Sequence, residues 1–199
     1  MDEIVKQALA RWPNVPHCTG WLRLDARGNW RMRDEAAQAR HEPGTPIRHA
    51  ALTGFINRNY ERDERGQWFF QNGPQRVYVE LEYTPWVMRL SCDESGRPAL
   101  ADHTGRPFVP AAAYLDECGA VLFADDGARA GIARVAVLHD HDLDLLSALA
   151  TLDDDGSGGT FHWRDDVALP LQPIRRDEVP ARFGFVASPA AAAAGAHAS

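Results

Sequence analysis

The chain has 199 residues, of which 45% are hydrophobic and 25% are charged, and its net charge is −7. This composition is typical of one globular domain or two small ones, and the lack of a basic block argues against nucleic-acid binding. Three scattered cysteines without a C-x-x-C pair argue against a disulfide or zinc framework, and no apolar run reaches the roughly 20 residues that span a bilayer. We therefore expect a cytoplasmic protein with no cofactor and no nucleic-acid or membrane partner, and the oligomeric state stays open.

Two common kinds of enzyme are excluded by missing motifs. Lys6 is the only lysine, so the Gly-Lys-Ser/Thr run of a nucleotide-binding P-loop is absent. The Gly-x-Ser-x-Gly elbow that carries the nucleophile of serine hydrolases is absent as well.

The N-terminal part of the chain combines two predicted helices with a strand hairpin. Apolar residues at helical spacing predict a short helix from Asp2 to Arg11. A second helix is expected from Pro46 to Tyr60, because Thr45 is a good N-cap and proline is favoured at the first helical position. The residues between these elements, 35–45, are expected to form a loop.

The motif Asp-x-x-Gly recurs along the chain, with examples that start at Asp25, Asp63, Asp93 and Asp116. Aspartate suits the first position of a type I turn, and glycine supplies the positive φ that closes the turn between antiparallel strands. The flanking strands are short and partly apolar. We therefore predict an α+β fold of antiparallel β-hairpins or a meander with a few packed helices, in which a motif repeats in two small domains.

The predicted organisation has four segments. An N-terminal helix occupies 1–16, a first α+β unit 17–92, and a second β-rich unit with one helix 93–187. The alanine-rich tail 188–199 has no apolar face to bury and is expected to be disordered.

The hairpin that begins at Gly66 carries the predicted ligand site. Alternation along the strand from Arg76 places Val77, Val79 and Leu81 on one face and Tyr78, Glu80 and Glu82 on the other. Because Pro74 has no N–H for a ladder, an open loop with free polar groups is expected from Gln71 to Gln75. Arginine grips anions bidentately, amides orient a ligand, and an indole stacks on it. The predicted ligand is small and anionic or polar, and the predicted site residues are Trp68, Gln71, Asn72, Gln75, Arg76, Tyr78, Glu80 and Trp86.

The C-terminal half offers one alternative site. His139 and His141 would share a face of an extended segment, and histidine is a common zinc and iron ligand. A polar junction before the helix predicted from Asp142 to Leu152 explains the same residues without a metal. A short strand is expected to begin at 161–163.

The motifs also resemble a known family. The repeated Asp-x-x-Gly-x-Trp, the Pro46-Ile47-Arg48 helix start, and Val77-Tyr78-Val79-Glu80 after a proline-containing turn are similar to a proteobacterial family of unknown function. The resemblance covers about residues 17–135 and implies a repeated α+β motif in two small domains, with a suggested role in ligand sensing or signal transduction. It supplies no catalytic residues.

Three functional hypotheses remain open from the sequence. We expect a non-catalytic ligand-binding or regulatory protein, because the motifs of the common catalytic classes are missing while the hairpin is rich in polar and aromatic groups. The alternatives are a metal-dependent hydrolase that uses His139 and His141, and a protein–protein interaction module with an exposed apolar patch.

Overall fold

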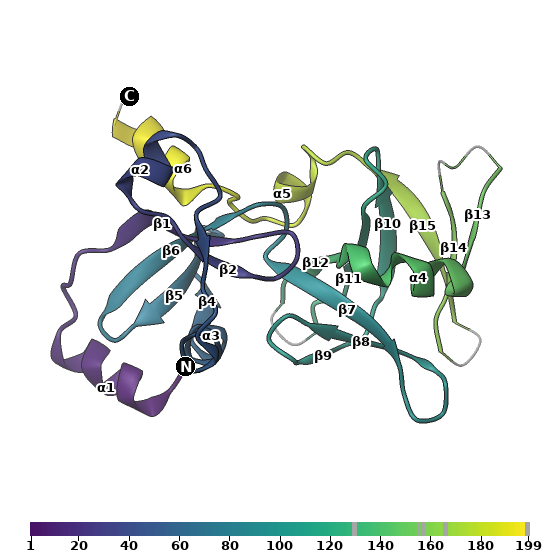
Figure 1. The fold of residues 1–199 in the computed structure, drawn as a ribbon, viewed down its shortest axis with the longest axis horizontal. Coiled ribbons are helices and arrows are strands. Elements are labelled where there is room, and N and C mark those ends of the chain that lie inside the picture. Colours follow the sequence, from purple (N-terminus) through teal and green to yellow (C-terminus); the bar gives the residue numbers. More distant parts are fainter. Residues whose placement is uncertain (129–130, 155, 157, 165–166, 198–199) are drawn as a thin grey trace. The chain divides into compact units, whose positions relative to one another are not determined.

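The chain folds into two compact units in the computed structural model (Figure 1), which describes residues 1–128, 131–154, 156, 158–164 and 167–197. The first unit consists of Met1–Asp25, Asn29–Tyr83 and Gly184–Ser199, and the second of Ala26–Gly28 and Thr84–Phe183. The first unit is therefore discontinuous, and the main division lies at Tyr83–Thr84, whereas the sequence suggested residue 92.

The first unit is built on a six-stranded sheet with the order β3-β2-β1-β6-β5-β4. Strands β1 and β6 run parallel at its centre, and the remaining pairs are antiparallel. The strands are β1 (Cys18–Leu24), β2 (Trp30–Met32), β3 (Thr45–Pro46), β4 (Tyr60–Arg62), β5 (Trp68–Asn72) and β6 (Gln75–Leu81).

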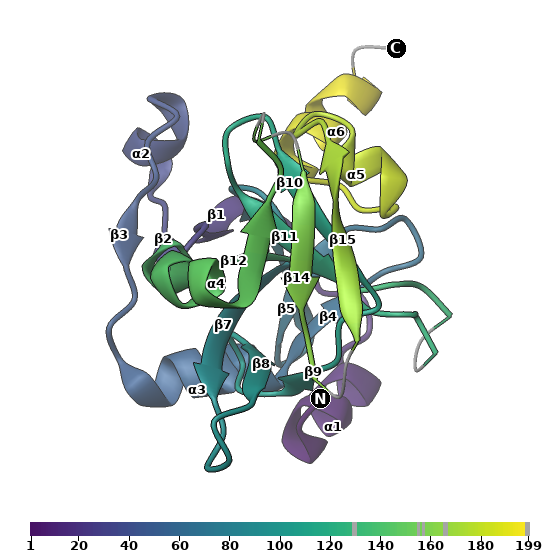
Figure 2. The same cartoon turned by 90° about the vertical axis from the view of Figure 1, so that its right-hand side faces the viewer.

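Helices lie on both sides of the first sheet. The ring of Phe55 in α3 (Ala50–Arg58) packs edge-on against Phe70 of β5, which fixes α3 to one face. Figures 1 and 2 place α1 (Glu3–Arg11) beside the β5–β6 hairpin, on the side away from α3. Helix α6 (Pro189–His197) contacts β1 and β6, and α2 (Glu35–Ala39) contacts β1.

The second unit contains a nine-stranded sheet with the order β13-β14-β15-β10-β11-β12-β7-β8-β9. Its core consists of fully buried side chains such as Met88, Leu122 and Phe123. Its strands are β7 (Trp86–Cys92), β8 (Pro98–Asp102), β9 (Pro107–Phe108), β10 (Ala112–Asp116), β11 (Val121–Ala124), β12 (Val135–Leu138), β13 (Ala150–Leu152), β14 (Gly159–His162) and β15 (Ala168–Ile174). Its helices are the 3₁₀ turn η1 (Asp140–Asp142), α4 (Leu143–Leu149) and α5 (Val179–Arg182).

A strand motif repeats between the two units. In the first, the meander β1-β2-β3 joins the meander β4-β5-β6 through the parallel pair β1–β6. In the second, β7-β8-β9 joins β10-β11-β12 through the parallel pair β7–β12, with the same strand order. The predicted mixed α+β fold with a repeated motif is confirmed at the level of strand topology.

The Asp-x-x-Gly motifs at Asp25, Asp63, Asp93 and Asp116 occupy equivalent turns of this repeat. Those at Asp25 and Asp93 close the first hairpin of each unit, and those at Asp63 and Asp116 close the β4–β5 and β10–β11 hairpins. In the turn of Asp116, the Oδ1 atom accepts the backbone N–H groups of Cys118 and Ala120 at 2.9 and 2.8 Å. The aspartate thus satisfies the amides that the turn leaves without a strand partner.

Several predicted boundaries differ from the structure. Thr45–Pro46 forms β3, because the N–H of Ile47 bonds to the carbonyl of Trp30; the helix begins later, capped by His49 Nδ1. Residues 35–45 contain α2, whose N-cap Asp34 accepts from the N–H of Ala37. Helix α4 ends at Leu149, and the following residues form β13.

The hairpin turn and the C-terminal tail also differ from expectation. Asn72 pairs with Gln75, so Gly73 and Pro74 form a tight two-residue turn and not an open loop. Gly73 has φ +57, and a proline fits the second position because its nitrogen makes no ladder bond there. The expected disorder of 188–199 is wrong over Pro189–His197, which forms α6; residues 198–199 lie outside the described residues.

None of the helices in the described part of the chain is both long enough and apolar enough to cross a bilayer.

Candidate functional site

The β5–β6 hairpin divides the predicted site residues between two faces of the first sheet. Phe69 pairs with Tyr78, and Gln71 pairs with Arg76. Because side chains alternate along a strand, these four residues and Glu80 share one face, called here the polar face. Trp68, Asn72 and Gln75 belong to the opposite face.

Two members of the polar face have structural partners. The carboxylate of Glu80 accepts from Ser188 Oγ at 2.5 Å and from the N–H of Ala190 at 3.0 Å, so it binds the N-terminus of α6. The hydroxyl of Tyr78 donates to Asp63 Oδ2 at 3.1 Å. Glu80 and Tyr78 therefore hold the fold, and their polar groups are occupied.

Arg76 has no such partner. Its guanidinium lies 4.5 Å above the ring centroid of Phe69, and the side chain is half-buried. Among the arginines that the structure describes, it is the half-buried one that donates to no carboxylate and no carbonyl. Glu80 and Glu82 do not neutralise it, because Glu80 binds α6 and Glu82 pairs with Arg23 at 3.1 Å.

The two glutamines of the hairpin differ in accessibility. Gln71 is 0% exposed; its Nε2 donates to the carbonyl of Gly73 at 2.9 Å, while its Oε1 has no hydrogen-bond partner among the described residues. Gln75 Nε2 donates to the carbonyl of Pro16 at 3.0 Å. That bond fixes the segment between α1 and β1 to the hairpin, so the role of Gln75 is to hold this segment in place.

His17 is a residue of this site that the sequence did not reveal. Its exposed imidazole contacts Tyr78 edge-on, with 5.8 Å between the ring centroids. The bond from Gln75 to Pro16 holds the imidazole there. No local pattern predicts this contact, because it follows from the parallel pairing of Cys18 with Val77 across a long stretch of chain.

Neither predicted tryptophan is part of the polar face. Trp68 packs against Tyr60 on the α3 side of the sheet, with 4.8 Å between the ring centroids. Trp86 belongs to the second unit, where it is buried beside His103. The structure therefore groups Gln71, Arg76, Tyr78 and Glu80 on one face, with Trp68 on the opposite face of the same sheet and Trp86 in the other unit.

The alternative histidine site has its acids bound to arginines. Asp142 receives both Arg89 Nε and Arg89 Nη2, at 2.7 and 2.9 Å, and Asp140 receives Arg27. Burial would raise the pKa of Asp142, but hydrogen bonds from Arg89 and from the N–H of Leu90 outweigh it and lower that pKa. Within the described ranges, no group of three or more histidine, cysteine or acidic side chains could hold a metal ion.

The two histidines themselves are close together. Their ring centroids lie 4.8 Å apart, and the Nδ1 atom of His139 accepts the N–H of His141 at 3.1 Å. Burial and the nearby charge of Arg89 lower the pKa of His139, which favours its neutral form.

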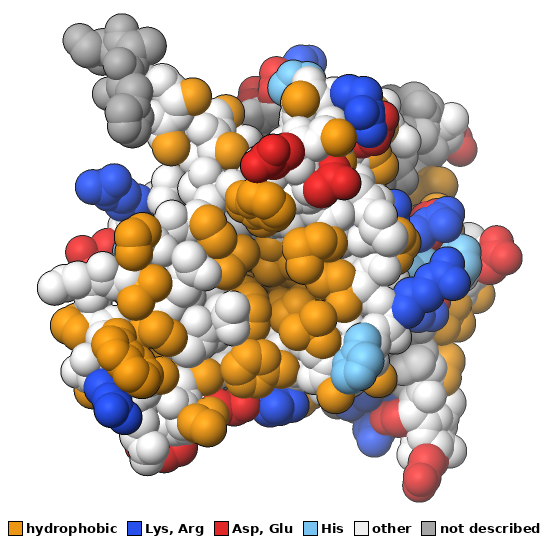
Figure 3. All heavy atoms as spheres, turned by 60° about the vertical axis from the view of Figure 1, so that its left-hand side comes forward, with side chains coloured by type: hydrophobic (Ala, Val, Ile, Leu, Met, Phe, Trp, Pro, Cys, Tyr) orange, Lys and Arg blue, Asp and Glu red, His pale blue; other side chains and the backbone are white. Residues whose placement is uncertain are grey.

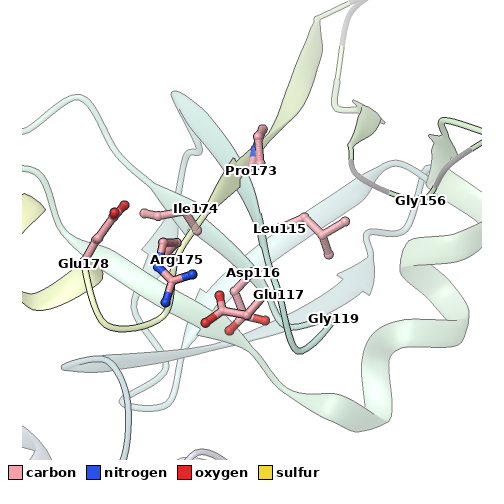
Figure 4. Close-up of a pocket in the computed structure, with 9 residues that line it drawn as sticks. All are labelled: Leu115, Asp116, Glu117, Gly119, Gly156, Pro173, Ile174, Arg175 and Glu178. Atoms are coloured by element: carbon pink, nitrogen blue, oxygen red, sulfur yellow. The ribbon is translucent and has the colours of Figure 1, made fainter.

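A hollow of about 460 Å³ lies in the second unit, at the β10–β11 turn and the end of β15 (Figure 4). Two of its charged side chains have partners in the neighbouring segment. Arg175 pairs with Asp177 at 3.2 Å, and Glu117 accepts the backbone N–H of Arg176 at 2.9 Å. The charged side chains of this hollow are therefore less available to a ligand than the guanidinium of Arg76.

Hydrophobic side chains gather around a hollow on the surface drawn in Figure 3. The exposed large hydrophobic residues of the first unit are Ile4, Trp12, Trp21, Met32 and Leu52. The interaction-module hypothesis requires a contiguous apolar patch, whereas single exposed apolar side chains are ordinary on a protein surface.

Comparisons with known proteins give a family and no function. The DUF2944 family model, described as "Protein of unknown function (DUF2946)", matches residues 1–190. The expected resemblance to an uncharacterised domain family is thereby confirmed. None of the curated proteins matches the chain.

Two solved structures are similar to this chain. A DUF1285 family protein from Silicibacter pomeroyi DSS-3 is 16% identical, with a TM-score of 0.46, and the match covers 90% of this chain and 98% of that one. A DUF1285 family protein from Shewanella baltica OS155 is 10% identical, with a TM-score of 0.39, covering 64% of this chain and 91% of that one.

Proposed function

We propose a ligand-binding function for this chain, which belongs to the DUF2944 family described as "Protein of unknown function (DUF2946)". In this proposal the chain is a non-catalytic binding or regulatory protein, and Arg76 anchors a small anion on the polar face. The observation that carries it is the half-buried guanidinium of Arg76, which meets no carboxylate or carbonyl in the described part of the chain.

The cost of partial burial supports this role for Arg76. A charged group that loses part of its water is normally compensated by an opposite charge or by hydrogen bonds. The ring of Phe69 compensates only in part, since a cation–π contact contributes on the order of 1 kcal/mol. A carboxylate or phosphate ligand would supply the missing acceptors in bidentate geometry.

The surroundings of Arg76 supply a floor and a rim for such a ligand. Phe69 lies beneath the guanidinium and stacks through its edge on Tyr78, with 5.9 Å between the ring centroids. His17 lies on the other side of Tyr78 and is exposed. A ligand held by Arg76 would therefore extend along a row of aromatic side chains.

The proposal is tested by thermal shift with a panel of small carboxylates and phosphates. We expect at least one compound to raise the melting temperature of the wild type and to lose its effect on Arg76→Ala. Arg65→Ala is the matched control, because Arg65 is an exposed arginine of the same unit. Arg76→Lys is expected to bind more weakly than wild type, because an ammonium lacks the bidentate fork.

Two results would contradict the proposal. Equal stabilisation of wild type and Arg76→Ala by every active compound would remove Arg76 from the site. The absence of any active compound, together with an unchanged melting temperature of Arg76→Ala, would assign the arginine to surface packing.

A further inference from the structure

Gln71 is the directly opposite partner of Arg76 on the polar face, and its Oε1 is buried without a hydrogen bond among the described residues. Burying an acceptor without a hydrogen bond costs free energy, so a ligand that donates a hydrogen bond to this oxygen would be favoured. We infer that Gln71 is a second binding group of the Arg76 site, that its ligand is an amino carboxylate, and that α1 is a displaceable cover over it. This inference rests on the proposed function.

The position of α1 supports its role as a cover. A Cβ atom at Gly73 would lie 4.0 Å from the Cβ of Ala8, so the helix runs against the turn next to Gln71. The N–H of Asp2 donates at 2.7 Å to Asn59 Oδ1, and the N–H of Gln71 donates to the carbonyl of the same Asn59. The start of α1 and the strand that carries Gln71 thus share one buried anchor.

The contacts that hold α1 in place are few. Val5 is the one buried side chain of the helix. Two ion pairs hold its start, Asp2 with Arg58 at 3.2 Å and the N-terminal ammonium with Glu61 at 3.6 Å, and both are partly exposed, so each contributes little. Ile4 and Trp12 are 71% and 50% exposed, so docking leaves part of the apolar surface of this segment in water. Because few contacts hold α1, moving it away from the hairpin to expose Gln71 would cost little free energy.

The charges near Gln71 and Arg76 select the ligand chemistry. A guanidinium takes a carboxylate, whereas an amide oxygen accepts a hydrogen bond from an ammonium group. Glu61 pairs with Phe69 and therefore lies on the polar face. Its carboxylate lies 3.6 Å from the N-terminal ammonium of Met1, so displacement of the N-terminal segment would free an acid for the ammonium group of a ligand. The guanidinium of Arg76, the amide oxygen of Gln71 and the carboxylate of Glu61 together match a zwitterion better than a dianion.

The ligand class is tested by isothermal titration of the standard L-amino acids and their des-amino carboxylic acids into the full chain. We expect an amino acid to bind and its des-amino analogue to bind about ten-fold more weakly. Gln71→Met removes the acceptor at similar volume and should reduce this difference, with Arg65→Ala as the control. An analogue that binds as tightly as its amino acid while Arg76→Ala abolishes both would overturn the inference and leave the proposed function standing.

The cover is tested with the double variant Ala8→Cys, Gly73→Cys. The 4.0 Å between the two Cβ positions matches the separation in a disulfide. We expect the oxidised double variant to bind the amino acid at least about ten-fold more weakly, and dithiothreitol to restore binding. Gly73→Cys alone controls for the strain at that turn and for the native thiols. Equal affinity of the oxidised and reduced double variant would show that α1 does not need to move.

Discussion

His103 is a half-buried histidine of the second unit, and its imidazole makes the stability of that unit depend on pH. Its Nδ1 accepts the N–H of Val87 at 3.3 Å, and a Cβ at Gly28 would lie only 2.8 Å from its own Cβ. Burial lowers its pKa from 6.5 to about 4, although the charge of Asp102 acts in the opposite direction. The folded chain therefore holds this histidine neutral across the mildly acidic range.

The sign and size of the effect follow from proton linkage. In the unfolded chain His103 is protonated below about pH 6.5, whereas in the folded chain it is protonated only below about pH 4. Its contribution to stability is therefore complete above pH 6.5 and is lost as the pH falls from 6.5 to 4. With these two pKa values, His103 lowers the free energy of unfolding by about 2 kcal/mol between pH 7 and pH 5.

The measurement compares denaturant unfolding of the wild type and His103→Asn at several pH values. Asparagine offers an oxygen in place of Nδ1 to the N–H of Val87 and does not titrate. We expect the variant to lose about 2 kcal/mol less than the wild type between pH 7 and pH 5, while His162→Asn, at an exposed position of the same unit, follows the wild type. Parallel losses in wild type and His103→Asn would refute the reasoning.

Two further predictions concern the C-terminal segment of the first unit. Glu80→Ala removes the acceptor for Ser188 and for the N-terminus of α6, so we expect a loss of about 1–2 kcal/mol and faster amide exchange in α6, measured by hydrogen exchange. Unchanged amide exchange in α6 would show that Glu80 does not hold this helix. Gly66→Ala should destabilise the chain by more than Gly96→Ala in thermal melts. Both glycines have positive φ, but a Cβ at Gly66 would collide with the carbonyl of Gly184, whereas at Gly96 it meets open space.

The fold was predictable where local chemistry decides it. The aspartate at the start of each Asp-x-x-Gly motif determines a turn within five residues, so Asp25, Asp63, Asp93 and Asp116 all close hairpins as expected. The parallel pairing of β1 with β6 was not predictable, because no local signal records which distant strand becomes a neighbour. The tail formed α6 because Glu80 and two strands supply the partners that its own sequence lacks.

The site was predictable only in part. Alternation along β6 correctly grouped Arg76 with Tyr78 and Glu80. It could not show that Gln71 would be fully buried, or that Ala8 of α1 would lie against the turn at Gly73, since both depend on residues far apart in the chain. Trp86 was wrongly assigned to the hairpin site because the boundary between the units falls just before it, between Tyr83 and Thr84.

The discontinuity of the first unit has a consequence for the order of events during synthesis. The ribosome releases nearly all of the second unit before it releases the residues from Gly184 onward. Those late residues complete the first unit, because the N–H of Val186 bonds to the carbonyl of Gly66 and the N–H of Leu81 bonds to the carbonyl of Ala187. The part of the chain that is translated first is therefore the last to close, and a chain that ends before Gly184 contains every residue of the second unit but lacks the residues that complete the first.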